Sequence, residues 1–236
     1  MTTPEIQKLC EKIKSEIEKV IIGKSENIDL ILTAIFSGGH VLLEDVPGTG
    51  KTMLAKTLAR CIDGNFSRIQ FTPDLLPSDV TGINFYDNSK NAFVFREGPV
   101  FANILLADEI NRATPRTQSS LLEAMEEKQV TVDGQTRRLP EPFFVIATQN
   151  PIETAGTFPL PEAQLDRFLM KLSMGLPNET DEMAILTNFM NNSPLETVEA
   201  LCTTALLSQI SETVRSIFVH PSIREYIIAI ANQTRR

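Results

Sequence analysis

Four residues of this chain have side chains and spacing suited to chemistry on a polyphosphate. Lys51 and Thr52 follow the glycine-containing segment 45–50, and Asp108 and Glu109 follow a long apolar run. A lysine ammonium binds phosphate oxygens, and threonine and aspartate supply oxygen ligands for Mg²⁺. A glutamate at a strand end can act as a general base toward water. The four residues therefore predict a site for a nucleoside triphosphate.

The segment 40–52 has the layout of a phosphate-binding loop. A short apolar run precedes two glycines, and apolar residues at helical spacing begin at Met53. Glycines let backbone N–H groups turn toward a phosphate, and the following helix N-terminus adds donors. Asp45 departs from the strict pattern, which has glycine there, and a plain glycine-rich turn is the alternative. The expected nucleotide contacts are Asp45, Val46, Pro47, Gly48, Thr49, Gly50, Lys51, Thr52 and Met53.

Three more polar residues are expected to meet this loop at one edge of a sheet. Asp108 and Glu109 end one apolar run, and Asn150 follows another. Because the carboxyl ends of parallel strands share one edge, these side chains should lie near Lys51. Asp108 is then a candidate Mg²⁺ ligand, and Asn150 a candidate for orienting the attacking water. An acidic strand exit and an Asn-Pro turn are the plainer explanations.

Hydrophobic periodicity predicts an α/β chain that becomes helical after residues 175–177. The expected helices begin with 4–20 and a second helix from Ser25, and end with 180–190, 199–218 and 221–231. Apolar and alternating runs predict five strands, and turn residues indicate hairpins at 82–98 and 129–139. Ile22 and Gly23, between the first two helices, are candidates to contact an adenine base, with an ordinary helix junction as the alternative.

Composition indicates an ordinary globular protein of 236 residues with a formal net charge of −8. That charge disfavours a generally basic nucleic-acid-binding surface. The three cysteines are scattered and form no CxxC pair, which disfavours a zinc site and fits a reducing, cytoplasmic location. We also expect no signal peptide and no membrane insertion.

Five sequence blocks together resemble the MoxR family of AAA+ ATPases over nearly the whole chain. Each block is a run of consecutive residues in the order that the family has. The blocks are 42–52 (LLEDVPGTGKT), 71–79 (FTPDLLPSD), 106–113 (LADEINRA), 147–151 (ATQNP) and 160–168 (LPEAQLDRF). Asp45 looks like an accepted variant within this family.

The resemblance implies a P-loop NTPase fold with a three-layer αβα core and a five-stranded parallel sheet over residues 1–175. It implies a small all-helical lid over 176–236, which looks truncated because no sensor 2 arginine is recognisable. It also implies ATP and Mg²⁺ bound between subunits of a homo-oligomeric ring, usually a hexamer. Protein clients, often with a von Willebrand A domain, would be the partners.

The resemblance also assigns roles to individual residues. Lys51 and Thr52 match Walker A, Asp108 and Glu109 match Walker B, and Asn150 matches sensor 1. Arg167 corresponds to an arginine finger that reaches a neighbour's site, and Gln70 is a candidate to restrain the catalytic glutamate. The hairpin at 83–97 resembles the insert of the helix-2-insert clade, and the one at 129–139 resembles the pre-sensor-1 hairpin.

Three hypotheses for function follow from these features. The first is an ATP-hydrolysing enzyme that remodels protein clients, with Glu109, Asn150, Arg167 and Lys51 as catalytic residues. The second is a nucleic-acid motor, based on Arg137 and Arg138 in the second hairpin and disfavoured by the net charge. The third is a nucleotide-gated binding module with little hydrolysis, based on the shortened lid.

Overall fold

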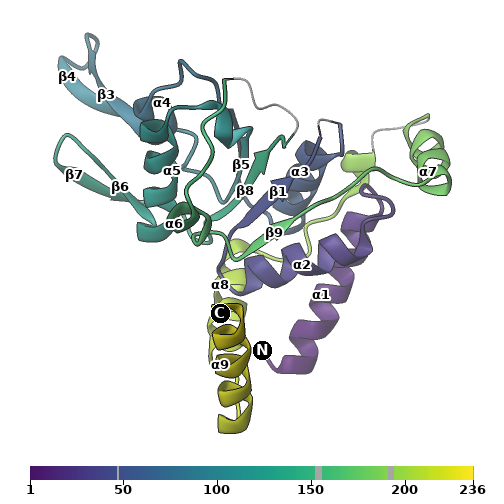
Figure 1. Cartoon of the computed structure of the whole chain (residues 1–236). Coiled ribbons are helices and arrows are strands. Elements are labelled where there is room, and N and C mark those ends of the chain that lie inside the picture. Colours follow the sequence, from purple (N-terminus) through teal and green to yellow (C-terminus); the bar gives the residue numbers. More distant parts are fainter. Residues whose placement is uncertain (47, 152–155, 191–193, 236) are drawn as a thin grey trace.

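The computed structural model describes residues 1–46, 48–151, 156–190 and 194–235. Its centre is a five-stranded parallel sheet with the strand order β2-β5-β8-β1-β9 (Figure 1). The strands are β1 (Val41–Glu44), β2 (Phe66–Gln70), β5 (Ile104–Asp108), β8 (Phe144–Gln149) and β9 (Met170–Leu172). The predicted α/β fold with a five-stranded parallel sheet is therefore confirmed.

The central strands are apolar up to their carboxyl ends because helices cover both faces of the sheet. In β5, Ile104 and Leu106 pack into one hydrophobic cluster, and Leu105 and Ala107 pack into the other. The flanking helices are α1 (Thr3–Glu18), α2 (Ser25–Phe36) and α3 (Lys51–Cys61) in the first cluster, with α4 (Pro77–Thr81) and α5 (Pro115–Glu127) in the second. These layers form the predicted three-layer core.

Two antiparallel hairpins project from the core at one end (Figure 1). They are β3 (Gly82–Asp87) with β4 (Ala92–Glu97), and β6 (Gln129–Val132) with β7 (Gln135–Arg138). Asn84 Nδ2 donates a 2.8 Å hydrogen bond to Asp133 Oδ2, and the Arg137 guanidinium lies 4.1 Å from the centre of the Phe95 ring. Both predicted hairpins are confirmed, and these contacts join them.

The C-terminal part contains α7 (Glu179–Phe189), the short helix η2 (Pro194–Thr197), α8 (Thr204–Arg215) and α9 (Pro221–Thr234). Two more short helices, η1 (Ile110–Arg112) and α6 (Glu162–Leu165), lie between strands of the sheet. The prediction of one helix over 199–218 is wrong at its start. The backbone N–H groups of Leu201 and Cys202 both donate to Cys61 O, and the Thr203 side chain caps α8. These bonds hold 201–202 in a non-helical segment.

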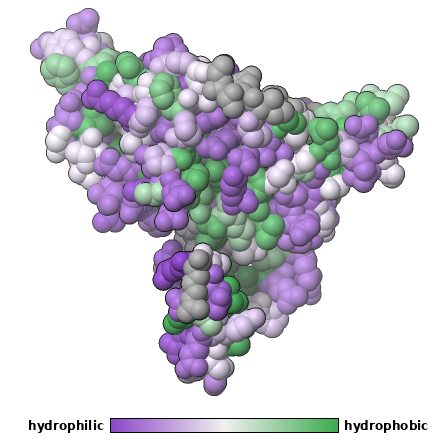
Figure 2. Space-filling model, in the orientation of Figure 1, coloured by the Kyte–Doolittle hydropathy of each residue, from purple (hydrophilic) through white to green (hydrophobic). Residues whose placement is uncertain are grey.

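The helices after the sheet differ in how much of their apolar surface they bury. Leu207 and Ile210 of α8 are fully buried against the core, whereas α7 and α9 have no buried residue. Figure 2 shows hydrophobic patches over α7 and at the β3–β4 hairpin. Among the described residues, no helix is both long enough and apolar enough to cross a bilayer.

Candidate active site

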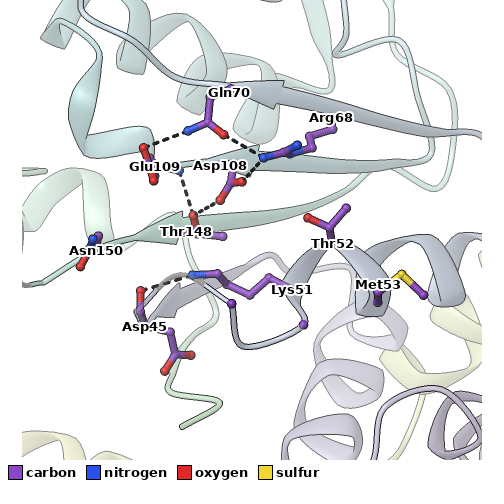
Figure 3. A pocket seen from close by; sticks show the side chains of 12 residues that line it. Asp45, Lys51, Thr52, Met53, Arg68, Gln70, Asp108, Glu109, Thr148 and Asn150 are labelled. Atoms are coloured by element: carbon purple, nitrogen blue, oxygen red, sulfur yellow. Dashed lines mark hydrogen bonds and ion pairs between the residues drawn. The ribbon is translucent and has the colours of Figure 1, made fainter. Parts of the chain in front are cut away.

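A cavity of about 410 Å³ opens at the carboxyl edge of the sheet, between the loop before α3 and the ends of β2, β5 and β8 (Figure 3). It is the edge at which α/β sheets bind ligands. The described residues that line it are Asp45, Gly48, Gly50, Lys51, Thr52, Met53, Arg68, Gln70, Asp108, Glu109, Thr148 and Asn150.

The glycines of the loop are needed for backbone conformation rather than for space. Gly48 and Gly50 have φ angles of 90° and 85°, and a Cβ added at either would meet no atom within 4 Å. Only glycine adopts such angles without strain. Lys51 begins α3, and its Nζ donates to Asp45 O at 3.3 Å and to Val46 O at 3.2 Å. Neutral carbonyls are weaker partners than charged phosphate oxygens, so the ammonium is suited to exchange them for a phosphate.

The Asp45 side chain serves a different purpose from the predicted nucleotide contact. The carboxylate is buried and accepts hydrogen bonds from Ser173 Oγ at 3.0 Å, Gly175 N at 3.1 Å and Met174 N. These donors belong to the segment that leads from β9 toward α7. Only the backbone carbonyl of Asp45 faces Lys51 (Figure 3). Asp45 therefore ties the phosphate loop to this segment, which explains why glycine is absent here.

Thr148, which the sequence analysis did not single out, organises the two acidic residues. Its Oγ1 donates to Asp108 Oδ1 at 2.7 Å and accepts from Glu109 N at 2.8 Å. Thr148 lies on β8 beside β5, where Ala107 pairs with Ala147. Its place near the end of an apolar strand is the signal that could have indicated it. Glu109 has a φ of 56°, and this left-handed backbone is held by the bond to Thr148.

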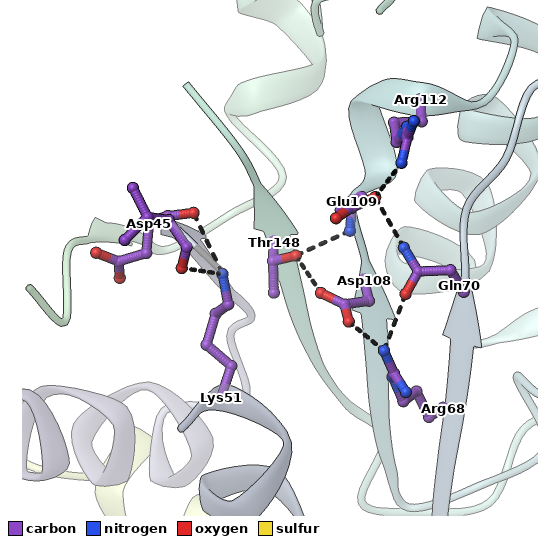
Figure 4. A network of polar contacts seen from close by, with 9 residues as sticks. Asp45, Lys51, Arg68, Gln70, Asp108, Glu109, Arg112 and Thr148 are labelled. Atoms are coloured by element: carbon purple, nitrogen blue, oxygen red, sulfur yellow. Dashed lines mark hydrogen bonds and ion pairs between the residues drawn. The ribbon is translucent and has the colours of Figure 1, made fainter. Parts of the chain in front are cut away.

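The Glu109 carboxylate is held by two side chains (Figure 4). Gln70 Nε2 donates to Glu109 Oε2 at 2.9 Å, and Arg112 Nη1 donates to the same oxygen at 3.0 Å. Gln70 therefore makes the contact that a residue restraining Glu109 requires. Arg112 is a second partner that sequence reasoning missed.

Arg68 is also part of this cavity, although sequence reasoning assigned it no role. Its Nη2 donates to Asp108 Oδ2 at 2.7 Å and to Gln70 Oε1 at 2.9 Å. Arg68 and Gln70 are two positions apart on β2, so both side chains lie on one face of the strand. That spacing was visible in the sequence, but the pairing of β2 with β5 was not.

Thr52 and Asp108 suit a magnesium ion by their chemistry. A hydroxyl and a carboxylate are hard oxygen ligands, and both residues line the same cavity (Figure 3). Mg²⁺ bound in this way commonly takes only one or two protein ligands and completes its shell with phosphate and water. The two residues therefore fit the predicted metal role.

The remaining predicted residues differ in whether they line the cavity. Asn150 is buried and lines the cavity. Arg167 is not among its described lining residues, and forms an ion pair of 2.6 Å with Glu126 of α5. Val46 and Thr49 belong to the loop but do not line the cavity among the described residues, and Pro47 lies outside the described part of the chain.

Ile22 and Gly23 also lie outside the lining of the cavity, as far as the described residues show. A Cβ added to Gly23 would lie 2.1 Å from Asp181 Oδ2, so a side chain of α7 fills the space beside this glycine. Gly23 is nevertheless exposed and Ile22 is half-buried, so their contact with an adenine base stays a prediction.

The parallel sheet, the glycine loop and the carboxylates at its edge define the architecture of a P-loop nucleotide-binding protein. The model of the ATPase family associated with various cellular activities (AAA) matches residues 40–170. The Bacillus subtilis protein YeaC is 50% identical over 232 residues, covering 98% of this chain and 72% of that protein. Chaperone MoxR1 of Mycobacterium tuberculosis is 44% identical over 226 residues, covering 96% of this chain and 59% of that protein.

Two further comparisons agree. Protein MoxR of Methylorubrum extorquens is 35% identical over 173 residues, covering 71% of this chain and 50% of that protein. The crystal structure of a Cytophaga hutchinsonii protein described as a candidate ATPase superposes with a TM-score of 0.87 and 42% identity, covering 94% of this chain and 67% of that one. The chain belongs to the MoxR family of AAA+ ATPases. It spans less than two thirds of each MoxR-named relative.

Proposed function

We propose that this chain binds ATP with Mg²⁺ and hydrolyses it to remodel or activate protein partners. The observation that carries the proposal is the convergence of Lys51, Asp108, Glu109 and Asn150 on one cavity at the carboxyl edge. Phosphoryl transfer needs this combination of phosphate cradle, metal ligand and water-activating carboxylate.

Each residue has a distinct task in this proposal. Lys51 binds the β- and γ-phosphates, and Glu109 accepts a proton from the attacking water. Asn150 donates a hydrogen bond that orients this water. Mg²⁺, held by Thr52 and Asp108, neutralises phosphate charge when it is bound. Catalysis then rests mainly on positioning and on electrostatic stabilisation.

Two side chains hold the Glu109 carboxylate in its present position. Gln70 and Arg112 both donate a hydrogen bond to its Oε2, so the carboxylate has to give up these bonds to turn toward an attacking water. We therefore assign Gln70 the role of restraining Glu109. The same contacts favour the third hypothesis, a nucleotide-gated module with little hydrolysis, in the form of a low basal rate that a partner raises.

The assembly we propose is a homo-oligomeric ring, a hexamer in the cytoplasm, in which Arg167 reaches the neighbour's site. Arg167 suits this role because it lies outside its own cavity and is partly exposed. The name of the MoxR1 relative supports a chaperone-like task. Clients with a von Willebrand A domain and membership of the helix-2-insert clade remain part of the proposal.

The nucleic-acid motor receives less support. Arg137, one of the two residues behind that hypothesis, lies over Phe95 and donates to Gln135 Oε1 at 2.8 Å. The contact between hairpins thus gives Arg137 a structural explanation.

The test of the proposal uses two lysines on one helix. We expect Lys51→Ala to abolish phosphate release from ATP and to weaken binding of a fluorescent ATP analogue, because Lys51 lines the cavity. The control is Lys56→Ala, an exposed residue on α3 that should leave both unchanged. Equal behaviour of the two variants would contradict the assigned site.

A further inference from the structure

Arg68 places a positive charge inside the cavity, and the proposed hydrolysis does not use it. Its side chain is 45% exposed, and Asp108, its ion-pair partner, is 15% exposed. The Nη2–Oδ2 distance of 2.7 Å makes this a direct hydrogen-bonded ion pair. Figure 4 shows the guanidinium between Asp108 and Gln70.

Both carboxylate oxygens of Asp108 already have partners. Thr148 donates to Oδ1, and Arg68 donates to Oδ2. A Mg²⁺ ion on Asp108 would bring two positive charges to the carboxylate that already binds a guanidinium. Like charges at such short range repel strongly in a partly closed cavity. Arg68 and the metal ion therefore compete for Asp108.

Arg68 is also linked to Glu109, the proposed base, through hydrogen bonds of Gln70. The nitrogen that binds Asp108 donates to Gln70 Oε1 as well, and the other end of the same amide, Nε2, donates to Glu109. The amide plane of Gln70 is thus fixed at both ends. If Arg68 moves away, Gln70 keeps only one of these two bonds and is free to rotate about its side-chain torsions. The contact to Glu109 then weakens.

A purely structural role explains Arg68 less well. The backbones of β2 and β5 already pair at every position from Phe66 to Gln70. An exposed ion pair adds little to this pairing, on the order of 0–1 kcal/mol. Arg68 instead lies between Asp108, the proposed metal ligand, and Gln70, the partner of Glu109. This position is suited to transmit an effect of metal binding to Glu109.

We propose that Arg68 is a positioning residue that couples metal binding at Asp108 to the release of Glu109 through Gln70. Arg68 would be displaced when a metal ion binds Asp108, Gln70 would lose its anchor, and Glu109 would be left with the single bond from Arg112. The inference rests on the proposed function of the site. It adds that metal binding regulates when Glu109 can act on water.

The first test measures metal binding without turnover. Binding of a fluorescent ADP analogue to the full chain is titrated with MgCl₂ for wild type, Arg68→Ala, Arg68→Gln and the control Arg224→Ala, an exposed residue of α9. Removing the competing charge should lower the Mg²⁺ midpoint at least about fivefold, the lower end of typical coupling between two bound groups. Arg68→Gln removes the charge but keeps a shorter polar side chain that can form hydrogen bonds, so this variant provides the test if the alanine variant does not fold.

The second test measures the connection to Glu109. Phosphate release at a Mg²⁺ concentration below the wild-type midpoint should rise severalfold in Arg68→Gln and in Gln70→Ala, and the double variant should rise no further, because both changes act through one contact. At saturating Mg²⁺, where the metal has already displaced Arg68, wild type and Arg68→Gln should have similar rates.

The outcomes separate the two proposals. An unchanged or raised Mg²⁺ midpoint in both Arg68 variants would overturn the competition, and additive effects in the double variant would overturn the coupling. Failure of wild type to bind the ADP analogue at any Mg²⁺ concentration would instead overturn the proposed function on which the inference rests.

Discussion

The two edges of the central sheet treat ionisable side chains in opposite ways. At the carboxyl edge Asp108 and Glu109 keep hydrogen-bond donors around them and face an open cavity. At the amino edge His40, directly before β1, is 5% exposed and packs near the rings of Phe143 and Phe144. The carboxyl edge holds ionisable groups that can change partners, and the amino edge holds His40 buried in one fixed arrangement.

The amino edge fixes the protonation state of His40. Its Nδ1 accepts from Val145 N at 3.1 Å, so Nε2 carries the proton and donates to Met125 O at 3.3 Å. Burial lowers the pKa of His40 from 6.5 to about 4, because a charged ring would be poorly solvated there. Protonation of Nδ1 would also break the bond from Val145. The comparison teaches that the same strands serve stability at one edge and chemistry at the other.

The largest predicted effect tests whether the carboxyl edge is only half of a site. Arg167→Ala should lower ATP turnover by roughly 10³- to 10⁵-fold, as for other arginine fingers, while nucleotide affinity stays unchanged. Phosphate release and analogue binding measure the two quantities. Mixing Arg167→Ala with Glu109→Gln should restore part of the activity, because mixed assemblies contain some intact pairs. No restoration in mixed assemblies would show that Arg167 acts within its own chain.

The next prediction concerns His40 at the amino edge and the loss of stability at acidic pH. The unfolded chain binds a proton at His40 near pH 6.5, whereas the folded chain resists protonation down to about pH 4. Stability from this residue is therefore complete above pH 6.5 and is lost as the pH falls toward 4, in all about 3 kcal/mol. Urea unfolding at pH 7 and pH 5 should show a smaller loss for His40→Gln than for wild type. Equal losses in the two proteins would contradict the assignment.

A smaller effect is expected where the phosphate loop meets the segment after β9. Asp45→Gly restores the residue of the general loop pattern but removes the acceptor for Ser173, Met174 and Gly175. We expect a loss of about 1–3 kcal/mol in the free energy of unfolding, because buried N–H groups lose their partner. Chemical denaturation measures it, with Asp74→Gly, at an exposed turn residue, as a control for added glycine. An unchanged free energy of unfolding in Asp45→Gly would show that the hydrogen bonds of the Asp45 carboxylate contribute nothing to stability.

Much of the carboxyl edge was predictable because parallel strands end together. Glycine spacing located the loop, and apolar strand ends located Asp108, Glu109 and Asn150. The alternation of β2 placed Arg68 beside Gln70, but which strand lies next to β2 depends on the complete fold. Without that neighbour, the contact with Asp108 could not be foreseen.

The missed features are contacts between distant segments. Asp45 reaches residues 128 to 130 positions further along the chain, and no local pattern encodes such a bond. The same limit explains the helix predicted over 199–218. The helical spacing of apolar residues begins before Thr204, the first residue of α8. The bonds from Leu201 and Cys202 to Cys61 stop the helix from forming over those earlier residues.

The most direct test of the account is the separation of binding from hydrolysis in Glu109→Gln. This variant keeps the shape of the side chain and removes the base, so the ATP analogue should bind as to wild type. Phosphate release should fall by roughly 10²- to 10⁴-fold, the usual contribution of a general base. Glu123→Gln, an exposed carboxylate on α5, should change neither quantity. Intact binding with wild-type turnover in Glu109→Gln would contradict the central claim that this carboxylate activates water at the carboxyl edge.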